Sequence, residues 1–171
     1  RYIPLLRGLP SPPSRAAARA ALGIAGDAFL VCSFGMLTPA KLNLKLVDCW
    51  MRSALAQNPR CRLVFVGEPM AGGFDGEILA AVERTGLGER MRITGFVDEA
   101  AYRHYLGAAD VAVQLRTQSR GETSRAVLDC LAHGLPTIVN AHGANRELPA
   151  EVLTMLPDPF TDAQLVQALE A

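Results

Sequence analysis

The chain has 171 residues, of which 50% are hydrophobic and 20% charged, and its formal net charge at pH 7 is zero. This composition excludes a disordered chain and is typical of one globular domain that buries its core without disulfides. The neutral balance gives no overall field for nucleic acid or an anionic membrane surface, so any bound anion must be held locally.

The chain begins with a proline-rich stretch that has no helical or strand period. We expect residues 1–13 to be the remnant of an interdomain linker, and Ser14 to cap a short helix from about Arg15 to Leu22. The four cysteines have no C-x-x-C spacing and lie in apolar runs, which predicts reduced core thiols in a cytoplasmic protein. No run reaches the roughly 20 apolar residues of a membrane span.

From residue 29 onward, short apolar runs alternate with segments of helical spacing. Six runs are apolar on both faces, as in a parallel sheet that is covered on both sides: residues 29–34, 62–66, 91–94, 110–115, 137–139 and 152–156. Between them, apolar residues recur at helical spacing around 47–55, 78–82, 102–106 and 127–131. The alternation predicts a doubly wound, Rossmann-like α/β domain over residues 14–171.

The predicted site lies in the loops that follow these strands, because ligands of open parallel sheets bind outside the carboxyl ends of the strands. The strongest candidate is the polar turn 116–124, which leads from a buried strand into a helix. A helix N-terminus can hold an anion or phosphate through its free N–H groups. Lys41, shortly after the first strand, could bring a cation to the same phosphate.

Two common nucleotide-binding signatures are missing from this sequence. No G-x-G-x-x-G and no G-x-x-x-x-G-K-[ST] follows the first strand, which argues against a dehydrogenase and a P-loop NTPase. The histidines have no metal-ligand spacing with cysteine or acidic residues, and only His142 lies in a loop after a strand. The sequence therefore predicts no metal site.

Several segments together resemble the C-terminal domain of retaining GT-B glycosyltransferases of family 4 (group 1). They occur in the right order and spacing over about residues 25–157, at 34–41 (FGMLTPAK), 64–67 (VFVG), 93–97 (ITGFV), 108–111 (AADV) and 115–139. The resemblance implies a hexosyltransferase in which this half binds a UDP- or GDP-linked sugar. An N-terminal half, absent here, would supply most of the site for a glycan or glycolipid acceptor.

The same resemblance implies polysaccharide or lipopolysaccharide biosynthesis in the cytoplasm, with peripheral membrane association of the full-length enzyme left open. It implies no cofactor and no metal. Lys41 would neutralise the diphosphate, and Glu122 would contact the donor sugar; both are therefore predicted catalytic residues. The predicted donor-binding residues are Gly35, Met36, Lys41, Gly95, Phe96, Val97, Arg116, Gly121, Glu122, Thr123, Ser124 and Asp129.

Two positions depart from the family pattern. Many members have arginine directly after the first-loop glycine, where this chain has Met36; either Arg116 or Arg120 compensates, or phosphate binding is weaker. Many members also have two glutamates separated by seven residues, the second of which binds ribose. Here Asp129 follows Glu122 with only six residues between them. A subset of bacterial family members with a Gly-Glu-Thr-Ser loop is more similar to this chain.

Two other functions remain open at this point. A sugar-nucleotide epimerase of the same fold would need further acid/base groups, and a non-catalytic binding or scaffolding domain would need none. On the glycosyltransferase interpretation, we expect the isolated chain to bind nucleotide and to transfer little sugar.

Overall fold

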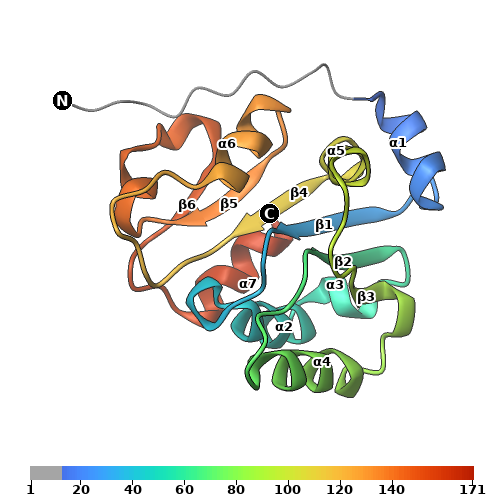
Figure 1. Cartoon of the computed structure of the whole chain (residues 1–171), viewed down its shortest axis with the longest axis horizontal. Coiled ribbons are helices and arrows are strands. Elements are labelled where there is room, and N and C mark those ends of the chain that lie inside the picture. The colour runs from blue at the N-terminus through green and yellow to red at the C-terminus, as the bar shows by residue number, and fades with distance from the viewer. Residues whose placement is uncertain (1–12) are drawn as a thin grey trace.

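The computed structural model describes residues 13–171 and shows one parallel sheet with helices on both faces (Figure 1). The strands are β1 (Phe29–Phe34), β2 (Cys61–Val66), β3 (Met91–Ile93), β4 (Val111–Gln114), β5 (Thr137–Asn140) and β6 (Thr154–Leu156), in the order β3-β2-β1-β4-β5-β6. The helices are α1 (Arg15–Leu22), α2 (Asn43–Arg52), α3 (Ala54–Gln57), α4 (Phe74–Arg84), α5 (Glu99–Ala108), α6 (Arg125–Ala132) and α7 (Asp162–Glu170). The predicted doubly wound α/β fold is confirmed.

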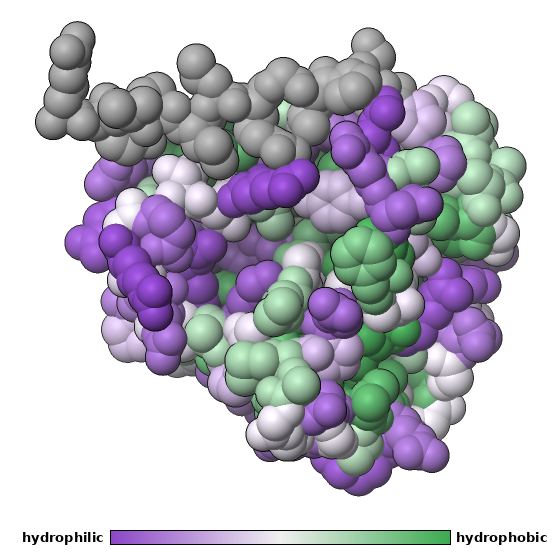
Figure 2. Space-filling model, in the orientation of Figure 1, coloured by the Kyte–Doolittle hydropathy of each residue, from purple (hydrophilic) through white to green (hydrophobic). Residues whose placement is uncertain are grey.

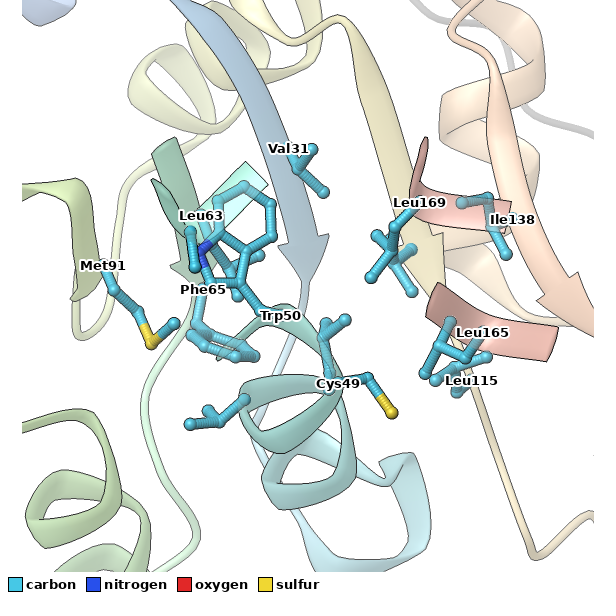
Figure 3. Packing of buried hydrophobic residues seen from close by; sticks show 14 of the residues in the cluster. Val31, Cys49, Trp50, Leu63, Phe65, Met91, Leu115, Ile138, Leu165 and Leu169 are labelled. Carbon is cyan, nitrogen blue, oxygen red and sulfur yellow. The ribbon is translucent and has the colours of Figure 1, made fainter. Parts of the chain in front are cut away.

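One face of the sheet packs against α2, α4 and α7. Trp50 of α2 is fully buried in this cluster, beside Leu63 and Phe65 of β2 (Figure 3). Leu165 and Leu169, four residues apart on α7, enter the same cluster because that spacing places them on one side of the helix. Alternate residues of β1, β2 and β4 face the other way and enter a second buried cluster, so these central strands are buried on both sides.

The opposite face packs against α1, α5 and α6, and α1 is fixed there by a buried ion pair. Arg19 is 3% exposed, and its guanidinium donates to Asp110 Oδ2 at 2.7 Å and to the carbonyl oxygen of Ala28 at 2.8 Å. The same carboxylate oxygen accepts the N–H of Leu30 at 2.7 Å. These contacts join α1 to the residues at the start of β1 and β4.

Most predicted boundaries agree with the structure to within a few residues. Ser14 caps α1 by accepting the N–H of Ala17 at 3.3 Å, as predicted. The last strand is shorter than residues 152–156, because Ala150–Val152 forms a 3₁₀ turn before Thr154. The predicted linker lies outside the described residues except for Pro13.

All four cysteines are buried and unpaired, as predicted. Within residues 13–171, no helix combines the length and the apolar character that crossing a bilayer requires. On the face shown in Figure 2, hydrophobic patches are interrupted by hydrophilic residues.

Candidate functional site

The candidate site lies where β1 and β4 end side by side at the centre of the sheet. The chain leaves β1 toward β2 and leaves β4 toward β5, so the loops diverge and open a crevice at this point. The loops after β1 and β4 are joined by a hydrogen bond from the Thr117 N–H to the carbonyl of Ala40 at 2.7 Å. After the neighbouring strands β2 and β3, the Gly67 N–H donates to Thr94 Oγ1 at 3.0 Å. The crevice therefore has a largely fixed rim.

A cleft of about 560 Å³ opens at this rim, and we call it the main cleft. It is lined by Gly35, Lys41, Phe96, Val97, Asp98, Glu99, Tyr102, Arg116, Glu122, Thr123, Ser124, Arg125 and Ala126. The structure thus brings together most of the residues that the sequence predicted for donor binding. Met36, Gly95, Gly121 and Asp129 are not among the lining residues.

Lys41 places its ammonium group over the backbone at the end of β1. Its Nζ donates to the carbonyl of Phe34 at 3.3 Å, and a Cβ at Gly35 would lie 2.8 Å from that Nζ. Gly35 also has φ +90°, which side chains rarely adopt. Burial, followed by the charge of Arg116, lowers the pKa of Lys41 to about 8.

A second glycine permits the loops after β1 and β2 to touch. A Cβ at Gly67 would lie 2.4 Å from the carbonyl oxygen of Gly35, a separation that no side chain tolerates. Gly35 in turn donates its N–H to the carbonyl of Val66 at 2.9 Å. The two glycines therefore set the position of the backbone beneath Lys41.

Arg116 and Glu122 face each other across the mouth of the main cleft. Arg116 Nη1 lies 3.5 Å from Glu122 Oε1, and the Arg120 N–H donates to Glu122 Oε2 at 2.6 Å. Backbone hydrogen bonds to the carboxylate, then the nearby arginine charges, lower the pKa of Glu122. Glu122 is thus a charged group whose side chain is 57% exposed.

The helix α6 begins at the wall of the main cleft, as the sequence predicted. Ser124 is its N-cap and accepts the N–H of Val127 at 3.4 Å. The other amides of the first turn have no partner within the helix, and the helix end carries roughly half a positive charge. These amides can hold an anion in the cleft.

The side chain of Asp129 lies behind this wall. It is completely buried, its Oδ2 accepts a hydrogen bond from the Tyr102 hydroxyl at 3.2 Å, and Arg125 Nε is 3.6 Å away. Burial and the neighbouring carboxylate raise the pKa of Tyr102. Tyr102 and Arg125 line the cleft in front of Asp129, so its predicted ribose contact would require these side chains to move.

Sequence reasoning missed Tyr102 as a site residue. Its ring packs edge-on against Phe34 at 5.4 Å between centroids, and the residue also lines the main cleft. The helical spacing of the aromatic residues signalled only a core-facing side, so the pattern held no sign of this second role.

A second opening of about 710 Å³, which we call the side cleft, adjoins the main cleft. The two share Lys41, Arg116 and Glu122, and Arg120 lines the side cleft alone. His142 lines neither cleft, and its Nδ1 lies 2.6 Å from Asp158 Oδ2. Within the described residues, 13–171, no three His, Cys, Asp or Glu side chains gather as a metal site requires.

Comparisons with known proteins agree with this geometry. The family model described as "Glycosyl transferases group 1" matches residues 28–171. A search of curated proteins finds no match. Among solved structures, the C-terminal domain of the glycosyl transferase group 1 family protein LpcC from Francisella tularensis is 20% identical, with 94% of this chain and 83% of that chain covered and a TM-score of 0.76.

Two longer proteins also contain this fold. Sucrose-phosphate synthase from Thermosynechococcus elongatus is 25% identical, with 94% of this chain and 41% of that chain covered and a TM-score of 0.76. HepE from Anabaena, in complex with UDP, is 21% identical, with 90% and 42% covered and a TM-score of 0.73. The chain therefore spans about two fifths of the length of these two proteins.

Proposed function

The chain belongs to the group 1 glycosyl transferase family, and from this premise we propose that it is the donor-binding half of a retaining family 4 enzyme. Its fold is that of the C-terminal domain of GT-B glycosyltransferases. The proposed donor is a nucleoside diphosphate sugar. The proposed acceptor is a glycan or glycolipid, and we propose that a separate N-terminal domain supplies most of its binding site. One observation carries this proposal: Lys41, Glu122 and the N-terminus of α6 line a single cleft.

In the proposed reaction, the bond between the anomeric carbon and the diphosphate breaks, and negative charge grows on the β-phosphate. A hydroxyl oxygen of the acceptor bonds to the anomeric carbon and gives its proton to the departing diphosphate. The Lys41 ammonium and the first-turn amides of α6 face the cleft and would stabilise that charge. Glu122 would orient the sugar through its hydroxyl groups, and residues 95–97 would contact the base. We propose that these groups suffice without a metal ion.

The choice of UDP as the first probe rests on HepE, whose structures contain UDP and UDP-glucose. The wider proposals are a hexosyltransferase of polysaccharide or lipopolysaccharide biosynthesis that acts in the cytoplasm. An epimerase would need further acid/base groups, and neither it nor a scaffold is favoured by the family match.

The proposal is tested by titrating UDP, GDP and ADP into the 171-residue chain by calorimetry, with and without EDTA. We expect one of them to bind, and we expect Lys41→Ala to weaken the diphosphate more than the bare nucleoside. Lys45→Ala is the matched control, because that lysine pairs with Asp162 on α7. If millimolar concentrations of all three leave the heat signal unchanged, the scaffold interpretation prevails.

A transfer assay tests the second part of the proposal. The 171-residue chain should transfer little sugar, because its acceptor half is proposed to lie on another domain. Transfer at ordinary enzyme rates, about 1–1,000 per second, would contradict this.

A further inference from the structure

Arg116 carries a guanidinium nitrogen whose hydrogen bond is missing. Its Nη1 atom is buried, and no group within residues 13–171 accepts a hydrogen bond from it. The Glu122 carboxylate lies 3.5 Å from it, which suffices for an ion pair but exceeds the usual length of an N–H···O bond. Buried polar atoms nearly always have a partner, so this one indicates where a ligand oxygen belongs.

The main chain of Arg116 is held in place by the buried side chain of Asn140. Asn140 is completely buried, and its amide accepts the Arg116 N–H at 2.9 Å and donates to the Arg116 carbonyl at 2.8 Å. The same amide nitrogen lies 3.4 Å from Asp158, which contacts His142. The base of the Arg116 side chain is therefore fixed, while its end faces the cleft.

The charges around Arg116 favour an anion. Lys41 lines the same two clefts, and the charge of Arg116 is one of the two causes that lower its pKa. Of the three carboxylates that line the main cleft, Asp98 caps α5, Glu99 lies in the first turn of α5, and Glu122 contacts Arg116. Two cations that repel each other in one cleft are stabilised by a ligand with two negative charges.

The geometry also chooses between the two arginines that could replace a cation at Met36. Met36 is 49% exposed and is not among the residues that line the main cleft. Arg116 lines both clefts next to Lys41, whereas Arg120 lines only the side cleft. Arg116 is therefore the arginine that can share a diphosphate with Lys41.

We propose that Arg116 exchanges partners when the donor binds, which deepens and rests on the proposed function. In the structure, Arg116 forms an ion pair with the Glu122 carboxylate. In the complex, the guanidinium binds the β-phosphate, and the released carboxylate turns to the hydroxyls of the sugar. Glu122 thus opposes binding of a nucleoside diphosphate that has no sugar and favours binding of the sugar-linked donor.

The test uses the 171-residue chain, calorimetry at pH 7 and whichever of UDP, GDP and ADP binds best. Glu122→Gln should tighten the diphosphate about threefold to tenfold and weaken its glucose-linked form by a similar factor. Arg116→Gln should weaken the diphosphate at least about tenfold and the monophosphate less than about threefold, with partial rescue by Arg116→Lys. Arg84→Gln, an exposed arginine at the end of α4, is the control.

The decisive measurement combines the two substitutions. With Arg116→Gln present, Glu122→Gln should no longer tighten the diphosphate, because the pair that it releases is already absent. If Glu122→Gln alone fails to tighten it, or tightens it equally in both backgrounds, the exchange is refuted while the proposed function stands. If the unmodified chain binds none of the three diphosphates, both proposals are refuted. Should Arg116→Gln unfold the chain, the same comparison is made with Arg116→Met, which also removes the charge but keeps a longer apolar side chain.

Discussion

Replacing Lys41 with methionine should stabilise the nucleotide-free protein against unfolding and should weaken its binding of diphosphates. The pKa of Lys41 falls from its ordinary 10.5 to about 8, because burial and then the charge of Arg116 disfavour the ammonium form. At 1.36 kcal/mol per pKa unit, keeping this lysine charged at pH 7 costs about 3 kcal/mol of folding free energy. Losing the 3.3 Å hydrogen bond to Phe34 offsets about 1 kcal/mol, so we expect a net gain of about 2 kcal/mol.

The stability gain from Lys41→Met should fall as the pH rises. Between pH 8 and 10.5 the unfolded chain binds more protons than the folded chain, so the unfolding free energy of the unmodified protein rises with pH. The penalty is fully present below pH 8 and fades as pH rises toward 10.5. By about pH 9.5 the advantage of Lys41→Met should therefore be close to zero.

Urea unfolding at pH 7 and at about pH 9.5, followed by fluorescence, measures the difference in stability between Lys41→Met and the unmodified protein. The chain has one tryptophan, Trp50, and it is fully buried, so its emission reports global unfolding. Lys45→Met is the control and should lower stability by no more than about 1 kcal/mol, because its ion pair with Asp162 is partly exposed. The reasoning fails if Lys41→Met lowers stability at pH 7, or if its gain is the same at both pH values.

Three further substitutions probe the framework around the site. Asp110→Asn leaves the buried charge of Arg19 without its anion and should cost about 3–5 kcal/mol in urea unfolding; a loss below about 1 kcal/mol would contradict the argument. Gly67→Ala places a Cβ 2.4 Å from the Gly35 carbonyl and should weaken UDP about tenfold in calorimetry, whereas unchanged affinity would show that the loops can separate. Asn140→Ala removes both hydrogen bonds to the main chain of Arg116 and should cost about 2–3 kcal/mol in thermal unfolding. An unchanged melting temperature would show that these two bonds do not stabilise the loop after β4.

The fold was predictable wherever apolar pattern and local chemistry agree. β1 was predicted from its apolar run with the bounds that the structure has, and Ser14 was predicted as a cap from its place before a helical segment. The start of β6 was misplaced, because the apolar residues Val152 and Leu153 continue the run although the backbone first turns at Ala150. An apolar run records burial, and it does not record where the ladder of hydrogen bonds begins.

The site was predictable in its position and less so in its contacts. Lys41 and Ser124 could be placed from the sequence, because each follows a strand by a short loop and those strand ends meet at one edge. The contact between Arg116 and Glu122 depends on how the turn folds back, and the buried Asp129 depends on Tyr102 from a distant helix. Neither leaves a periodic trace in the sequence.

The two ends of the central strands β1 and β4 differ in what they contact. The buried contacts of Arg19 and Asp110 tie down the start of both strands, and Gly35 and Arg116 follow their other ends. Substitutions in the loops that follow β1 and β4 therefore fall at the opposite ends of these strands from the ion pair between Arg19 and Asp110. If these loops bind the donor as proposed, substitutions that change donor preference should cost little folding free energy, because they leave the contacts of Arg19 and Asp110 in place.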